Sequence, residues 1–414
     1  MSIDHLAAGI FAVALLHTFL AKQLERLSKR YPRHAGVFHL LGEVEIVFGF
    51  WAMVLIAALA LAASPQQAVQ YAESRNYTEP LFVFVVMVIA ASRPLVATVQ
   101  TLLQGLASAV PVATPLALAW LGLALVPLMG SLITEPAAMT IAALTLAPLV
   151  FTPRMPARLK YLALGVLFVN VSIGGTLTAY AAPPVLMVAT PWGWDSAFML
   201  QHFGWKAALA VLLNASLATW FMRKHLQHTA AAPADQSKMP WTVVAVHIVL
   251  LACVVLLAHH PVLFIGVFLL FLAYTHAYAQ YQSPLILKEA LLVGFFLAGL
   301  VVLGGLQSWW LQPLVASMAP LTLFFGALGL TAITDNAALT YLGSQIEGMS
   351  DSAKYMLMAG AVAGGGLTVI ANAPNPAGVA LLKHGFSNAS ISIGGLLLGA
   401  LAPTSIAALA FLLL

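Results

Sequence analysis

Apolar runs of about 17 to 25 residues recur along this 414-residue chain and constrain its fold more than any other feature. A run of that length can cross a bilayer as a helix. Hydrophobic residues make up 62% of the chain and charged residues 7%, against about 25% charged residues in soluble proteins. Because a helix satisfies its own backbone hydrogen bonds, the sequence predicts an all-α polytopic membrane protein.

The positions of the basic residues predict how the chain crosses the membrane. The first apolar segment, Ile3 to Leu20, is followed by Lys22, Arg26, Lys29, Arg30 and Arg33. Cytoplasmic loops carry an excess of Lys and Arg, so we expect a retained first span with the N-terminus outside. The net charge of +4 comes from such short loops beside spans, which indicates contact with membrane lipid and argues against nucleic acid as a partner.

One carboxylate stands in the middle of a long apolar run. The segment from Leu330 to Tyr341, LTAITDNAALTY, carries Asp335 and Asn336 among small residues and threonines. An ionisable side chain at membrane depth is costly and is therefore a candidate functional residue. The alternative for Asp335 is a carboxylate satisfied by a helix end in a packed core.

A second copy of this pattern lies upstream around Glu135. Both copies read Ile-Thr-acid-x-Ala-Ala-x-Thr, and each is followed by Gly-Gly-x-Leu-Thr, beginning at Gly174 and at Gly364. Five predicted spans separate the two acids, so the copies should have opposite orientations in the membrane. Inverted repeats with broken helices are typical of secondary transporters. The alternative is a chance match between stretches rich in Gly, Ala and Thr that let helices pack closely.

These patterns divide the chain into four parts. We expect an N-terminal span and cytoplasmic loop over 1–36, a first inverted repeat over 37–226, a linker and connecting span over 227–261, and a second inverted repeat over 262–414. About ten transmembrane helices are predicted, together with two re-entrant hairpins, at 115–151 and 313–347, that carry the acids at their tips. Two full spans at 115–151 satisfy the charge pattern as well.

The candidate site is a set of oxygen-bearing side chains and the glycines beside them. Sodium prefers carboxylate, hydroxyl, amide and freed backbone oxygens, and protons compete for the same carboxylates. The predicted ion- and proton-binding residues are Asp335, Asn336, Glu135, Thr134, Thr334, Gly174, Gly175, Thr178, Gly365, Thr368, Asn372 and Asn375. Possible accessory residues are Arg93, Glu43 and Asn170. Apart from transported sodium at Asp335, Asn336 and Glu135, the sequence predicts no metal and no cofactor.

At these residues the chain resembles the ion-transporter superfamily, which includes NhaD-type sodium/proton antiporters and ArsB-like arsenite-efflux permeases. The resemblance runs from about Val37 to the C-terminus. It rests on Asp335-Asn336 and on the stretch from Asn170 to Thr178, which is followed by Pro183-Pro184. It is closest to a bacterial branch of sodium/proton antiporters. It implies a bacterial inner membrane protein and a homodimer in which a transport domain moves against a scaffold.

The chain departs from that family pattern in its first half. Glu135 is followed by Pro136 where an amide is expected, and Val185 follows Pro184 where the related motif often has Asn. The second half keeps Asn375 after Pro374. We therefore expect Asp335 with Asn336 to carry the main site and Glu135 to complete or tune it.

Alternating access at such a site predicts exchange of sodium, or another monovalent cation, for protons. The alternatives are a sodium-coupled symporter of a small anion or carboxylate and an arsenite-type exporter of a neutral solute. Acids at both tips argue against an anion. An intramembrane hydrolase is disfavoured because the sequence has neither His-Glu-x-x-His nor Gly-x-Gly-Asp, so no enzymatic activity is predicted.

Overall fold

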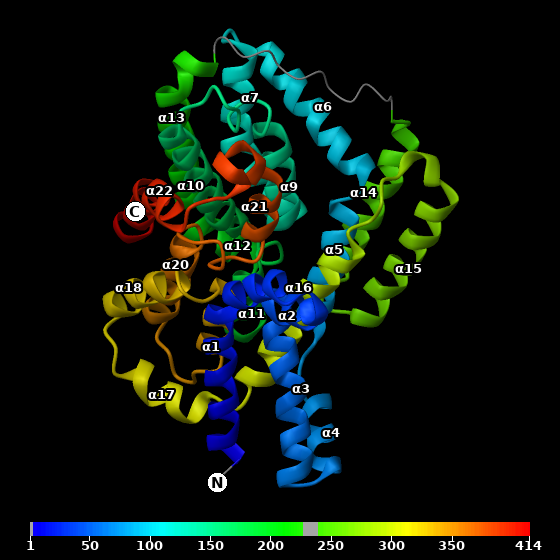
Figure 1. Cartoon of the computed structure of the whole chain (residues 1–414), viewed down its shortest axis with the longest axis vertical. Coiled ribbons are helices and arrows are strands. Elements are labelled where there is room, and N and C mark those ends of the chain that lie inside the picture. The colour runs from blue at the N-terminus through cyan, green and yellow to red at the C-terminus, as the bar shows by residue number, and fades with distance from the viewer. Residues whose placement is uncertain (1–2, 227–238) are drawn as a thin grey trace.

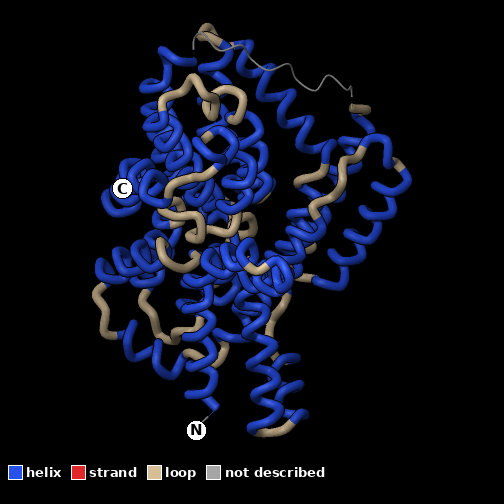
Figure 2. Tube along the Cα trace, in the orientation of Figure 1, coloured by secondary structure: helices blue, strands red, loops and turns tan. Residues whose placement is uncertain are grey.

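The computed structural model describes residues 3–226 and 239–414. Within these residues the chain is helical and contains no strand, which confirms the prediction of an all-α fold (Figure 2). In the described part of the chain, four helices are long and apolar enough to cross a membrane, or up to seven if each bent pair of helices is one span. The protein is therefore a multi-pass membrane protein, and the predicted count of about ten spans with two re-entrant hairpins stays a prediction.

The helices of the first half come in chain order up to residue 226. They are α1 (Ile3–Arg30), η1 (Pro32–His34), α2 (Ala35–Gly42), α3 (Val44–Ala62), α4 (Pro65–Glu73), α5 (Thr78–Ala90), α6 (Arg93–Ala109), α7 (Thr114–Leu123), α8 (Leu125–Ile133), α9 (Glu135–Leu146), α10 (Ala157–Gly174), η2 (Gly175–Leu177), α11 (Pro183–Trp192), α12 (Ser196–Met199), η3 (Leu200–Gly204) and α13 (Trp205–Leu226).

The helices of the second half follow residue 239. They are α14 (Trp241–Leu256), α15 (Pro261–Ala277), η4 (Ala279–Tyr281), α16 (Leu287–Gly304), α17 (Ser308–Ala316), α18 (Pro320–Thr331), α19 (Asn336–Ser344), α20 (Asp351–Gly364), α21 (Asn375–Leu382), η5 (Lys383–Gly385), η6 (Ser387–Ala389) and α22 (Ile393–Leu413). Most of the predicted linker, residues 227–238, lies outside the described part of the chain.

Two apolar segments are each divided into two helices. One comprises α5 and α6, which meet at 62° beside Arg93. Pro94 explains this break, because proline has no backbone N–H to donate to the preceding turn. The other comprises α2 and α3, which are divided at Glu43, whose backbone is extended.

Each candidate acid stands where one short helix ends and another begins. Glu135 is the first residue of α9, directly after Thr134, whose φ of 82° is rare for a residue with a branched side chain. Asp335 immediately precedes α19 in extended backbone. A Cβ added to Gly130 would lie 3.3 Å from that of Ala138, so α8 and α9 approach closely on either side of Thr134.

The two predicted Gly-Gly stretches also interrupt helices. In the first half α10 ends at Gly174, and α11 begins only at Pro183. In the second half α20 ends at Gly364, and α21 begins at Asn375, directly before Pro376. Backbone groups are thereby freed in the middle of both apolar segments, an arrangement tolerated at membrane depth only where protein or a polar cavity surrounds it.

The short helices of one half pack on the interrupted helices of the other. Helix α9 contacts α21, and α19 contacts α11, while α8 contacts α10 and α18 contacts α20. In Figure 1, α9 and α21 lie side by side near the centre of the molecule although far apart in sequence.

Matching residues of the two halves make similar contacts. Thr178 donates a hydrogen bond to the carbonyl of Ser131 (2.6 Å), and Thr368 donates one to the carbonyl of Ala332 (2.8 Å). These correspondences are consistent with the inverted repeat, which stays a prediction.

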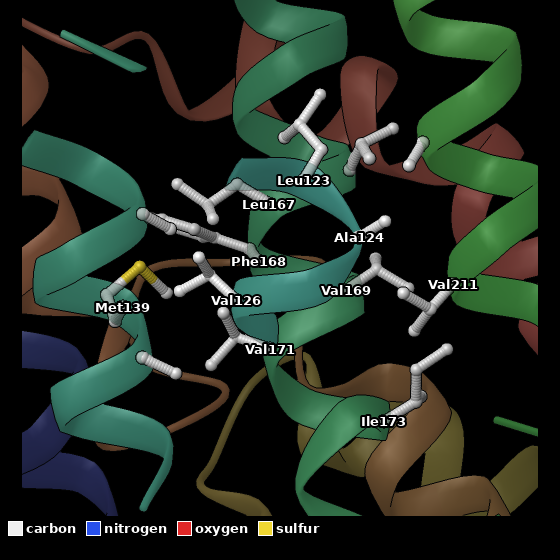
Figure 3. Close-up of a cluster of buried hydrophobic side chains, with 14 of the residues drawn as sticks. Leu123, Ala124, Val126, Met139, Leu167, Phe168, Val169, Val171, Ile173 and Val211 are labelled. Carbon is white, nitrogen blue, oxygen red and sulfur yellow. The ribbon is translucent and has the colours of Figure 1, made fainter. Parts of the chain in front are cut away.

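Helix α10 runs through the larger of two apolar clusters. Figure 3 shows its side chains Leu167, Phe168, Val169, Val171 and Ile173 among Leu123, Ala124, Val126, Met139 and Val211. All ten side chains are fully buried, so neighbouring helices enclose α10 on every side. The second cluster gathers buried residues of α1, α3, α5, α14, α15 and α16. The carboxylates lie on elements that contact both clusters.

We predict that Gly364→Ala destabilises the protein. A Cβ at Gly364 would lie 2.5 Å from the carbonyl oxygen of Leu328 and 3.1 Å from the Cβ of Thr331, so α18 and α20 must separate. Overpacking of this kind costs about 1 to 3 kcal/mol. The measurement is the Tm of the purified protein in detergent.

Gly326→Ala is the matched control on the partner helix α18, because a Cβ there meets nothing within 4 Å. That change should leave the Tm unaltered or raise it slightly, since alanine favours helix by about 1 kcal/mol over glycine. Equal Tm values for the two variants would contradict the close approach of α18 and α20.

Candidate functional site

Glu135 is fully buried, with 0% of its surface exposed. Its Oε2 accepts a hydrogen bond from Nδ2 of Asn372 at 2.9 Å. Gly175 lies against the carboxylate: a Cβ at that position would sit 2.5 Å from Oε1. Only glycine therefore allows the interrupted helix of the first half to approach Glu135 so closely.

Asp335 both caps a helix and lines a cavity, so it fits both interpretations of this residue, a satisfied helix-end carboxylate and a functional acid. Its Oδ1 accepts hydrogen bonds from the backbone N–H groups of Ala337 (2.8 Å) and Ala338 (3.1 Å), so it caps α19. A cap of this kind satisfies two N–H groups that have no partner within the helix. The residue also lines a cavity of about 30 Å³, and 7% of its surface is exposed. Capping thus accounts for one carboxylate oxygen and leaves the cavity contact unexplained.

Asn372 connects the two acids. It donates to Glu135 and also lines the cavity of Asp335, together with Thr334. The acids are 200 positions apart in sequence, yet one amide side chain contacts one of them and shares a cavity with the other. A cavity of about 30 Å³ holds one or two water molecules or one ion without its hydration shell.

Asn336 is held between the two halves. Its backbone N–H donates to the carbonyl of Ala371 at 3.1 Å, in the interruption between α20 and α21. Its Nδ2 lies 3.4 Å from Oγ of Ser172, which in turn donates to the carbonyl of Val362 at 2.8 Å. The amide is fully buried, and its Oδ1 has no donor within the described residues.

Buried oxygen atoms without a hydrogen-bond donor gather at this crossing. Among the described residues they are Thr134 Oγ1, Glu135 Oε1, Asn336 Oδ1, Asn372 Oδ1 and Asn375 Oδ1. A buried acceptor without a partner costs about 1 to 3 kcal/mol, so five in one region call for a ligand that oxygen atoms can hold. Hard monovalent cations and protons fit that requirement. No group of three or more His, Cys, Asp or Glu side chains occurs in the described part of the chain, as a resident transition metal would need.

Several predicted site residues shape the backbone around the acids. The hydroxyls of Thr178 and Thr368 donate hydrogen bonds to the carbonyls of Ser131 and Ala332. The hydroxyl of Thr334 donates one to the carbonyl of Leu330 at 2.8 Å. Asn375 donates to the carbonyls of Gly365 (2.8 Å) and Thr368 (2.9 Å) and so holds the second interruption together. A Cβ at Gly174 would lie 2.6 Å from the carbonyl of Pro127, which shows how closely α8 and α10 pack.

The accessory residues lie outside the cavity of Asp335. The Glu43 carboxylate is 3.9 Å from the ammonium of Lys288, at the junction of α2 and α3. Asn170 donates to the carbonyls of Leu123 (2.8 Å) and Val211 (3.2 Å) and accepts from Asn214 (2.9 Å), so it joins α10 to two neighbouring helices. Arg93 begins α6, at the break with α5.

The structure adds two polar residues that the sequence analysis did not select. Ser172 holds the Asn336 amide, and Thr18 of α1 lines the cavity of Asp335. Ser172 lies inside the motif that carries the family resemblance, so its position was a usable signal. Thr18 is one hydroxyl in an apolar helix expected to lie outside both repeats, and nothing in the local sequence distinguishes it.

Comparison with known proteins identifies a family. No curated protein matches the chain. Residues 2–414 match the family described as "Putative Na+/H+ antiporter". With nearly every residue included in that match, the chain belongs to this family.

Proposed function

We propose that the protein exchanges sodium, or another monovalent cation, for protons by alternating access, with Asp335 and Glu135 as the exchanging carboxylates. The family description supports this class of transport. Alternating access requires no covalent step and no cofactor, which fits a transporter rather than an enzyme.

The observation that carries the proposal is the group of buried acceptor oxygens around two carboxylates joined by Asn372. An anion or an electron-rich solute needs donors, whereas this region presents oxygens without donors. A cation without water can be bound by several of these oxygens at once, and a proton on either carboxylate occupies one of them and supplies a single hydrogen-bond donor. Cation and proton therefore compete for the same atoms, and that competition couples their movements in opposite directions.

The two acids have unequal roles in this scheme. Asp335 lines the cavity and is held in place by the N-terminus of α19, so it is the acid that meets the incoming ion. Glu135 is sealed behind Asn372 and Gly175, and it completes the oxygen set from the opposite half. Movement of α9 against α21 would change which side of the membrane reaches the pair.

The symport of a small anion or carboxylate is less well supported, because two buried carboxylates would repel such a substrate at the cavity. Export of a neutral solute such as arsenite gives those carboxylates no counter-charge to bind. Following the family resemblance, the protein is further proposed to be a homodimer in a bacterial inner membrane. Two inverted repeats, residues 37–226 and 262–414, would surround the site, and the N-terminus would lie outside.

We predict that Asp335→Asn abolishes exchange, because the amide can neither release a proton nor offer a charged oxygen to the cation. The measurement is the collapse of a preformed proton gradient in proteoliposomes on adding sodium, lithium or potassium. Glu73→Gln on α4, where the side chain is exposed, is the matched control and should retain the full rate. Exchange at the normal rate by Asp335→Asn would contradict the assignment of the main site.

Glu135→Gln tests the asymmetry between the acids. The amide oxygen of the variant can still accept the hydrogen bond from Asn372, but the variant loses the negative charge of the carboxylate. We expect residual exchange with a raised KM for the cation, in contrast to the complete loss at Asp335. If Glu135→Gln were inactive and Asp335→Asn active, the proposed roles would be reversed.

Asn372→Ala should raise the KM for the transported cation by about 10- to 100-fold. A hydrogen bond to a charged group contributes about 1.5 to 3 kcal/mol, and each 1.4 kcal/mol is about a tenfold change in affinity. Asn170→Ala is the comparison: its hydrogen bonds join α10 to its neighbours, so it should lower the Tm and leave the KM unchanged. An unchanged KM for Asn372→Ala would show that the amide does not connect the acids functionally.

A further inference from the structure

A second, much larger cavity lies away from Asp335. It has a volume of about 610 Å³, and its lining includes three segments at helix ends. They are the beginning of α5 at Thr78 and Glu79, the loop after α11 from Gly193 to Ser196, and the turn after α14 at Ala258 and His259.

A third cavity, of about 300 Å³, adjoins this one. Glu79 and Thr190 line both cavities, so these side chains stand in the wall between them. Glu79 is the one carboxylate, among the described residues, that borders both. We use the name vestibule for the two cavities together.

The vestibule reaches the elements that carry the proposed exchange site. Ala179 and Tyr180 line its larger part and directly follow Thr178 in the interruption between α10 and α11. Ser344 and Gln345 line its smaller part at the C-terminal end of α19, whereas Asp335 stands at the N-terminal end of the same helix. The vestibule and the cavity of Asp335 therefore lie at opposite ends of α19.

The charges around the vestibule favour a cation. The C-terminal ends of α11, α14 and α19 border it, and such ends carry partial negative charge. The N-terminal ends of α5 and α12 also face it, but Glu79 lies in the first turn of α5 and Asp195 caps α12 through Phe198. The basic side chains on its lining are His259 and Arg75, and the guanidinium of Arg75 stacks over the ring of Tyr71 at 4.7 Å.

The volumes of the vestibule and of the cavity of Asp335 indicate that a cation is hydrated in the first and dehydrated in the second. The larger cavity of the vestibule alone has room for about twenty water molecules at about 30 Å³ each, so an ion there keeps its hydration shell. The cavity of Asp335 has room for only one or two. Attraction in the vestibule is therefore long-range and acts before the ion loses its water.

We infer that Glu79 forms, with the ends of α11, α14 and α19, a recruiting site for hydrated monovalent cations that feeds the exchange site. Fields of this kind can raise the local concentration of counter-ions by about tenfold or more. Glu79 therefore sets the apparent affinity for the cation and leaves the exchange step at Asp335 unchanged. The inference rests on the proposed cation/proton exchange for its role in transport, but the attraction itself can be measured without transport.

The first experiment measures the attraction by cysteine labelling. Cys253 is the single cysteine, so Cys253→Ala gives a cysteine-free background for the reporter Thr190→Cys, whose position is exposed and borders both cavities. A cationic and an anionic methanethiosulfonate of similar size are compared, with their rates normalised to a small free thiol. We expect the cationic reagent to react about tenfold faster, and Glu79→Gln to remove most of that preference.

Glu73→Gln is the control for a nearby carboxylate, because Glu73 lies on α4 outside both cavities. It should leave the labelling preference intact. A preference that is missing, or that Glu79→Gln leaves unchanged, overturns the inference whatever the transport assay gives. Failure of the proposed function is a distinct result: the wild type would show no exchange while the labelling preference remained and supported the recruiting site.

The second experiment measures exchange by Glu79→Gln in proteoliposomes. The KM for the cation should rise by about three- to tenfold with the maximal rate kept within a factor of two. High ionic strength should reduce the difference in KM between Glu79→Gln and the wild type, because screening weakens long-range attraction. A fall in maximal rate at unchanged KM would assign Glu79 a structural role and overturn the inference.

Discussion

The hydrogen bond from Asn372 to Glu135 is the contact on which the candidate site depends. It joins residues 237 positions apart and brings an amide from the second interrupted helix to a fully buried acid of the first half. A carboxylate without such a partner would be very costly at membrane depth. Because Asn372 also borders the cavity of Asp335, loss of this contact would separate the acids and leave two weak sites in place of one.

The crossing of the two halves explains why so many small and polar residues occur there. Gly175 admits the Glu135 carboxylate, and Gly364 admits the backbone of α18. Thr178 and Thr368 hold the adjacent carbonyls. Each half supplies one acid and one interruption, so neither half can form the site alone. Relative movement of the halves would change which oxygen atoms surround the site, as alternating access requires.

The local sequence predicted the features that have a local cause. An acid in an apolar run selected Asp335 and Glu135, and pairs of glycines followed by prolines located the interruptions after Gly174 and Gly364. The long-range contacts could not be predicted in this way. The motif around Ser172 marks that residue without indicating that its partner is Asn336, and nothing near Thr18 indicates that α1 reaches the cavity of Asp335. Such contacts depend on how helices far apart in sequence pack together.

In the proposed exchange, cation and proton compete for the same buried oxygens. The decisive measurement is proton release on sodium addition, followed with a pH indicator in weakly buffered detergent solution of the purified protein. Competition predicts release that saturates with sodium, occurs in the wild type and is absent from Asp335→Asn. Sodium binding without proton release, or equal release from the variant, would contradict it.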